Sequence, residues 1–96
     1  MTFHEGEVIA VPCTIQCGPF PHEKLISVET TEGPFWGFAD KRNLHARDAG
    51  HGYLKGTFVS ESDDSITVRL FGEFFRTAMG LAYISRRNVV RFAEIQ

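Results

Sequence analysis

The sequence predicts one small all-β domain, a barrel or small sandwich of about six or seven antiparallel strands joined by short turns, some of them 3₁₀. Short segments alternate apolar and polar residues at a period of two, which is typical of half-buried strands. Clusters of Gly, Pro, Asn and Asp separate these segments. The chain has 96 residues. That length supports one hydrophobic core, so we expect residues 1–96 to form a single β-barrel domain.

The first half of the chain predicts three strands and one helical turn. Residues 7–17 form the first strand, in which Pro12 lies on the face opposite the apolar side chains and indicates an edge or bulge position. The apolar face of this strand carries Ile9, Val11, Cys13, Ile15 and Cys17. Residues 24–31 and 35–39 are the next strands. Residues 40–43 then read as a single helical turn, with Asp40 as its cap.

The second half of the chain shows a similar pattern of strands and turns after a polar loop at residues 45–52. Strands are expected at 53–60, 65–71, 81–85 and 89–93, with turns at 62–64 and 86–88. Residues 72–80 fit either a short helix, because their apolar residues have helical spacing, or two short strands around a turn. We favour strands there, because the stretch lies inside a β meander.

The two halves resemble each other in order. Residues 25–29 match 65–69, and the turn Lys41-Arg42-Asn43 matches Arg86-Arg87-Asn88. This order predicts half-repeats at about 6–48 and 51–94. A three-stranded unit buries its own apolar face poorly, so two units are expected to share one core.

The stretches 80–90 and 56–70 resemble the closing strands and the central hairpin of SH3-like and Sm-like small barrels. In those barrels a Gly-led apolar strand runs into one 3₁₀ turn and a short final strand. The resemblance implies the fold alone, and no functional residue is carried over from any family.

Composition and charge exclude several classes of function. Apolar residues make up 43% and charged residues 23%, and the formal net charge is −2, which are values of a folded globular domain. Neither half is basic enough for general phosphate-backbone binding, so nucleic acid is kept only as an alternative partner. No signal peptide and no membrane span is visible, so we expect a cytoplasmic protein with no membrane partner.

Metal binding is not expected. Cys13 and Cys17 lie on the apolar face of a strand with C-x₃-C spacing, where a free Cys packs as a small hydrophobe. No second Cys pair accompanies them, so we predict no metal site and no cofactor.

Two polar groups are candidate sites. His45, Asp48 and His51 are weak candidates for catalysis, because a His near a carboxylate can act as a general base, but no nucleophile lies beside them. The turns containing Lys41, Arg42, Arg86, Arg87 and Asn88 are candidate binding residues, because Arg suits bidentate contact with phosphate or carboxylate.

Adjacent aromatics give the candidate interface. Phe35-Trp36 and Phe74-Phe75 are neighbours in sequence, and neighbours in a strand point to opposite faces. At least one ring of each pair is therefore expected to leave the inner face and form an apolar surface, which commonly marks an interface.

Three functions stay open at this stage. The favoured one is a non-catalytic binding or assembly module that forms a homo-oligomer or binds another protein. The alternatives are an oligonucleotide- or anion-binding small barrel and a small enzyme with an inter-subunit site around residues 45–51. The sequence names no ligand, substrate or pathway.

Overall fold

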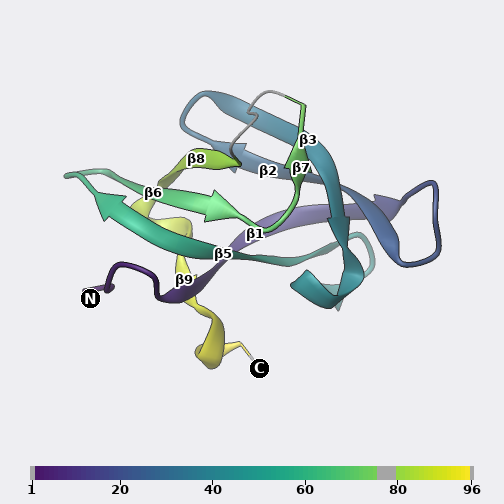
Figure 1. Ribbon diagram of the computed structural model, residues 1–96, viewed down its shortest axis with the longest axis horizontal. Coiled ribbons are helices and arrows are strands. Elements are labelled where there is room, and N and C mark those ends of the chain that lie inside the picture. The colour runs from purple at the N-terminus through teal and green to yellow at the C-terminus, as the bar shows by residue number, and fades with distance from the viewer. Residues whose placement is uncertain (1, 76–79, 96) are drawn as a thin grey trace.

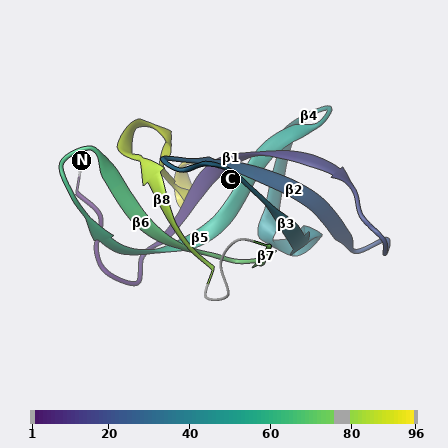
Figure 2. The same ribbon diagram turned by 90° about the horizontal axis from the view of Figure 1, so that it is seen from above.

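The computed structural model describes residues 2–75 and 80–95 of the chain. Its strands form one antiparallel sheet that curls into a half-barrel (Figure 1), and the view turned by 90° shows the same curl from above (Figure 2). No α-helix occurs within these described ranges, and the remaining regular elements are 3₁₀ turns. The predicted all-β fold with short 3₁₀ turns is confirmed, and the architecture is a curled sheet rather than a sandwich.

Nine strands and three 3₁₀ turns make up the described part of the chain. The strands are β1 (Val8–Cys17), β2 (Glu23–Thr30), β3 (Gly33–Asp40), β4 (Leu44–Asp48), β5 (His51–Glu61), β6 (Ser65–Leu70), β7 (Glu73–Phe74), β8 (Leu81–Ser85) and β9 (Val90–Arg91). The turns are η1 (Lys41–Asn43), η2 (Arg86–Asn88) and η3 (Phe92–Glu94). Seven strands follow one path in the order β7-β3-β2-β1-β5-β6-β8, while β4 pairs with β5 and β9 pairs with β1.

Strand pairing follows the same order on both sides of the central pair β1–β5. On one side β1 is followed by β2 and β3, and on the other side β5 is followed by β6 and β8. The turn η1 leads from β3 to β4, which returns to β5, and η2 leads from β8 to β9, which returns to β1. This crossed pairing is what two fused copies of one unit would produce. The repeat boundaries at 6–48 and 51–94 stay a prediction.

The core fills the concave side of the curled sheet. Alternate residues of each long strand point inward, so the period-two pattern becomes one continuous apolar layer. Eight side chains are almost fully buried there: Ile9, Val11, Ile26, Val28, Leu54, Ile66, Val68 and Ile84. Val11 and Leu54 pair directly across β1 and β5, at the middle of the sheet.

The region predicted as a polar loop is a β-hairpin. Leu44–Asp48 forms β4, and β5 already begins at His51, with a register shift between Ala46 and Asp48. The polar composition hid this hairpin, because residues 46–51 around its turn are all exposed and show no apolar alternation. In the ambiguous stretch 72–80, Glu73–Phe74 forms the short strand β7, as favoured. Residues 76–79 lie outside the described part.

Pro12 does not lie at the edge of the sheet, because β1 runs through its centre. On one side of β1, β9 pairs with Ile9 and Ala10, and β2 begins to pair at Cys13. Pro12 falls in the interval between those two ladders, where a residue without a backbone N–H loses no ladder hydrogen bond. The last strand is also shorter than predicted, because η3 replaces its second half.

Candidate functional site

The strands β3 and β7 carry a cluster of rings on the outer, convex face of the sheet. We call Trp36, Phe38 and Phe75 the outer aromatic patch. Phe75 is 67% exposed and Trp36 is 39% exposed. The Phe38 and Phe75 rings meet edge to face, with centroids 5.6 Å apart, a favourable arrangement for two aromatic rings.

Backbone pairing explains why these rings meet. Gly37 pairs with Phe74, and Phe38 pairs with Glu73. The Phe75 N–H donates to the Trp36 carbonyl at 3.0 Å, which continues the ladder by one residue. Strand alternation then places Trp36, Phe38 and Phe75 on the outer face.

The inner neighbours of these rings are buried, with Phe35 5% exposed and Phe74 7% exposed. One ring of each adjacent pair therefore leaves the core in the described part of the chain, as the sequence suggested. Whether this patch contacts another molecule stays a prediction.

Gly37 makes the close approach of β7 to β3 possible. A Cβ built on Gly37 would lie 2.2 Å from the Glu73 carbonyl oxygen and 2.8 Å from the Phe74 Cα. Real Cβ atoms do not approach other heavy atoms that closely. A side chain at position 37 would therefore push β7 away and separate Phe75 from Trp36 and Phe38.

A polar row continues from the aromatic patch across the outer face. Thr14 pairs with His51 on one side and with Ser27 on the other, and Ser27 pairs with Trp36. A shallow pocket of about 190 Å³ lies over this row. It is lined by Pro12, Cys13, Thr14, Ser27, Glu29 and His51. The Thr14 hydroxyl is buried without a hydrogen-bond partner, an arrangement that costs free energy in a folded protein.

The two basic turns differ in how their cations are used. In η1, the Asp40 carboxylate accepts from the Arg42 backbone N–H at 2.9 Å, which confirms Asp40 as the cap. The Arg42 guanidinium also lies 3.6 Å from the Asp40 carboxylate, but its side chain is 82% exposed. Lys41 is exposed as well.

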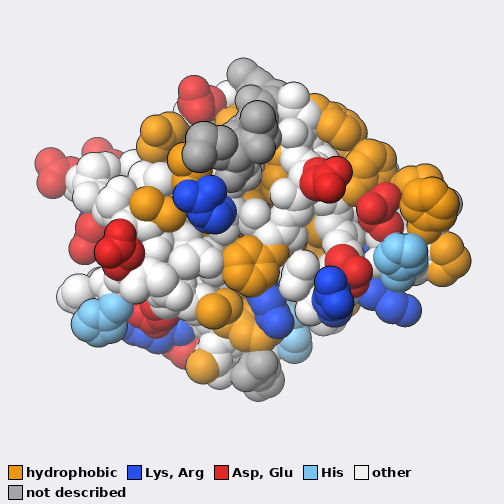
Figure 3. All heavy atoms as spheres, viewed as in Figure 1, with side chains coloured by type: hydrophobic (Ala, Val, Ile, Leu, Met, Phe, Trp, Pro, Cys, Tyr) orange, Lys and Arg blue, Asp and Glu red, His pale blue; other side chains and the backbone are white. Residues whose placement is uncertain are grey.

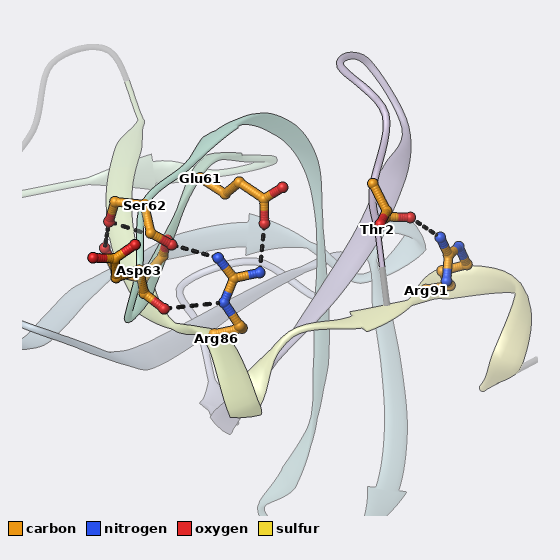
Figure 4. Close-up of polar contacts among 7 residues, drawn as sticks. Thr2, Glu61, Ser62, Asp63, Arg86 and Arg91 are labelled. Carbon is orange, nitrogen blue, oxygen red and sulfur yellow. Dashed lines mark hydrogen bonds and ion pairs between the residues drawn. The ribbon is translucent and has the colours of Figure 1, made fainter.

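In η2, Arg86 is committed to the neighbouring β5–β6 hairpin (Figure 4). Its Nη1 donates to the Glu61 carboxylate, its Nη2 to the Ser62 carbonyl, and its Nε to the Asp63 carbonyl at 3.4 Å. The Arg86 backbone N–H donates to the Asp64 carbonyl at 3.0 Å. These contacts give Arg86 a structural role. Arg87 is exposed, and Asn88 is half-buried.

The histidine candidates lie on the β4–β5 hairpin. His51 Nδ1 is 3.5 Å from the Asp48 carboxylate, and both side chains are largely exposed. His45 pairs instead with Tyr53 across the hairpin. The Tyr53 hydroxyl accepts from the Arg47 guanidinium at 3.0 Å.

A second open pocket, of about 300 Å³, brings His45 close to the C-terminal turn. His45, Arg47, Tyr53, Glu94 and Ile95 line it. The pocket therefore combines a histidine and a carboxylate from distant parts of the sequence. His51 and Asp48 are not among its lining residues, so the structure does not gather the three predicted catalytic candidates around one pocket.

The two cysteines have different environments. Cys13 is buried, and burial raises the pKa of its thiol to about 12. A thiol that holds its proton so firmly is a poor nucleophile and metal ligand. Cys17 is exposed, unlike the apolar-face position predicted for it, because β1 extends past the core at that end. Within residues 2–75 and 80–95 no group of three or more His, Cys, Asp or Glu side chains is placed to hold a metal ion.

Sequence reasoning missed two exposed aromatic side chains in the described part of the chain, Phe20 and Tyr83, the latter 48% exposed. Phe20 lies in the β1–β2 turn and is 58% exposed. The signal was present in the sequence, since a Phe between Pro19 and Pro21 in a turn cannot join the alternating pattern of either strand.

Comparisons with known proteins gave no assignment. No protein-family model, no curated protein and no solved structure matched this chain. Across the described ranges, no helix is long and apolar enough to cross a membrane.

Proposed function

We propose that the protein is a non-catalytic assembly module that pairs with a second copy of itself through the outer aromatic patch. One observation carries this proposal: Phe75 is 67% exposed although it lies against Phe38 and next to Trp36 in the ladder. Large rings outside the core and close together are the usual centre of a protein interface. We further propose that the half-barrel is of the SH3-like class, which the order β8, η2, β9 supports.

A second copy is the occupant that the surroundings of the patch favour. The patch lies at the rim of the sheet, where β7 is only two residues long, so another sheet can reach the rings without displacing a long strand. In a two-fold dimer the same patch meets itself, so a self-complementary apolar surface is sufficient. The Thr14–Ser27 row and Glu73 would then form the polar rim. The net charge of −2 gives little repulsion between copies.

The two alternative functions receive less support. Anion binding by the paired basic turns is less supported because Arg86 already binds the β5–β6 hairpin and Arg42 lies close to the Asp40 carboxylate. An enzyme around residues 45–51 is less supported because its two histidines line different pockets, His45 beside Tyr53 and His51 beside Thr14. Neither arrangement concentrates its candidate groups as closely as the aromatic patch does.

The test is the oligomeric state in solution, measured by analytical ultracentrifugation over a range of protein concentrations. We expect the wild-type chain to dimerise and Phe75→Ser to shift the equilibrium toward monomer by at least about tenfold. Phe20→Ser removes an aromatic of similar exposure outside the patch and is the matched control, which should still dimerise. A wild-type protein that stays monomeric at high micromolar concentration would overturn the proposal.

A further inference from the structure

The β1–β2 hairpin ends in an apolar protrusion. We call Pro19, Phe20 and Pro21 the aromatic tip; all three are exposed. The hairpin lies at one extreme of the long axis of the molecule, whereas β7 lies nearer the middle (Figure 1, Figure 2). The tip is thus a separate surface from the outer aromatic patch.

Several features hold Phe20 in this position. A Cβ on Gly18 would lie 2.2 Å from the Glu23 carbonyl oxygen, so only glycine allows the loop to close this tightly. The Glu23 N–H donates to the Phe20 carbonyl at 3.1 Å, and the two prolines fix their own φ angles. Phe20 is therefore presented in a pre-organised loop, which lowers the entropy cost of using it as an anchor.

Cations lie behind the tip. The Lys41 N–H donates to the His22 carbonyl at 2.8 Å, which fixes η1 against the base of the loop. Lys41 and Arg42 are exposed there, and Lys24 pairs with Cys17 where the hairpin begins. Of the two nearby carboxylates, Asp40 is bound to Arg42 and Glu23 is the other.

The opposite end of the molecule carries negative charge. The β5–β6 turn lies at the other extreme of the long axis (Figure 1) and contains Glu61, Asp63 and Asp64. The space-filling view shows acidic side chains gathered at that end, whereas hydrophobic, histidine, basic and acidic side chains lie together at the β1–β2 end (Figure 3). An anionic surface would therefore attract one end of the molecule and repel the other.

We propose that the β1–β2 end docks on an anionic lipid surface, with Phe20 entering the headgroup–acyl boundary and Lys24 and Lys41 meeting lipid phosphates. An apolar protrusion followed by cations matches the order of environments met on entering such a surface. The inference goes beyond self-association and does not rest on it.

The test is co-sedimentation of the full chain with vesicles of phosphatidylcholine alone or of phosphatidylcholine with phosphatidylserine. We expect binding only to the vesicles that contain phosphatidylserine, and weaker binding at higher salt. Phe20→Ser should reduce the partition coefficient by about tenfold or more. Phe20→Trp should retain binding, and the double variant Lys24→Gln/Lys41→Gln should weaken it.

Two controls separate this proposal from the proposed dimer. Phe75→Ser should still bind the anionic vesicles, because the patch is away from the tip. Circular dichroism of Phe20→Ser should match the wild type, because the ring is exposed. Equal sedimentation with both vesicle types, unchanged binding by Phe20→Ser, or binding to a single-stranded oligonucleotide without any binding to vesicles would overturn the lipid proposal.

Discussion

Phe74 and Phe75 are adjacent in sequence but lie on opposite faces of the sheet, 7% and 67% exposed respectively. Substituting one ring at a time therefore distinguishes a contribution to the stability of the core from a contribution to the outer surface. We expect Phe74→Ala to lower the free energy of unfolding by about 3–5 kcal/mol, because it empties a core position. At protein concentrations low enough to keep the chain monomeric, Phe75→Ala should change it by no more than about 0.5–1 kcal/mol. Urea unfolding of both variants measures the difference, and equal losses would show that Phe75 is also buried in solution.

Gly37→Ala is expected to detach β7 without removing any aromatic ring. The new Cβ would lie 2.2 Å from the Glu73 carbonyl oxygen, so β7 must move outward at a cost of about 1–3 kcal/mol. The Phe75 amide should then lose its bond to Trp36 and exchange its hydrogen faster. Amide exchange measured by NMR checks this. Exchange at Phe75 as slow as in the wild type would contradict the tight β3–β7 contact.

Much of the fold could be predicted because its strands alternate strictly. Ile66 and Val68 on β6, or Ile26 and Val28 on β2, face the core at a period of two, and the sequence shows this directly. The Asp40 cap was equally visible, because an Asp before a short turn has a definite hydrogen-bonding role. The β4–β5 hairpin was not visible, because its exposed polar side chains resemble those of a loop.

The candidate sites were less predictable, because they depend on contacts between distant residues. The sequence pattern placed Arg86 and Arg42 in equivalent turns. In the structure, Arg86 is held by the β5–β6 hairpin, and the hydrogen bond from its Nε to the Asp63 carbonyl joins residues 23 positions apart in the chain. The meeting of Phe75 with Phe38 depends on the β3–β7 register. No local pattern specifies either pairing.

Substitutions at Arg86 and Arg87 give a matched test of whether the contacts between Arg86 and the β5–β6 hairpin stabilise the fold. Arg86→Ala should lower the free energy of unfolding by about 1–2 kcal/mol, because it leaves the Glu61 carboxylate and two carbonyls without their donor. The loss is small because the Arg86 and Glu61 side chains are 38% and 35% exposed, so solvent partly screens their ion pair. Arg87→Ala should cost no more than about 0.5 kcal/mol. Thermal unfolding ranks the two variants, and a larger loss in Arg87→Ala would contradict the structural role of Arg86.

The two cysteines should react at different rates. Cys17 is exposed, whereas the Cys13 thiol is buried and its pKa is raised to about 12. In the folded protein we expect iodoacetamide to label Cys17 at least about tenfold faster than Cys13. Mass spectrometry of timed digests distinguishes the sites. Equal rates below the unfolding transition would show that β1 opens readily.

The same raised pKa gives an alkaline dependence of stability. Cys13 stays protonated in the folded state above its ordinary value of 9.0, while the unfolded chain ionises it. Its contribution is therefore complete below pH 9 and is lost as the pH rises toward the folded value. Cys13→Ala should show a shallower fall in the free energy of unfolding above pH 9 than the wild type. Parallel profiles would contradict burial of this thiol.

The Glu7 carboxylate predicts that stability is lost as the pH falls, whereas Cys13 predicts that stability is lost as the pH rises. The His4 backbone N–H donates to its carboxylate at 3.0 Å, and the Arg91 guanidinium lies 2.6 Å away. The hydrogen bond and then the Arg91 charge lower the pKa of Glu7 below 4.5, although partial desolvation opposes them. The stabilisation is therefore present above pH 4.5 and is lost as the pH falls through the lower folded value. Glu7→Gln should narrow the gap to wild type as the medium becomes acidic, whereas Glu5→Gln serves as a control with the same change of charge. Unfolding curves from pH 7 down to about pH 2 measure this gap in the free energy of unfolding. A gap that widens with acid would show that the pKa of Glu7 is not lowered by folding. It would also contradict the ion pair between Glu7 and Arg91 that joins the N-terminal segment to β9.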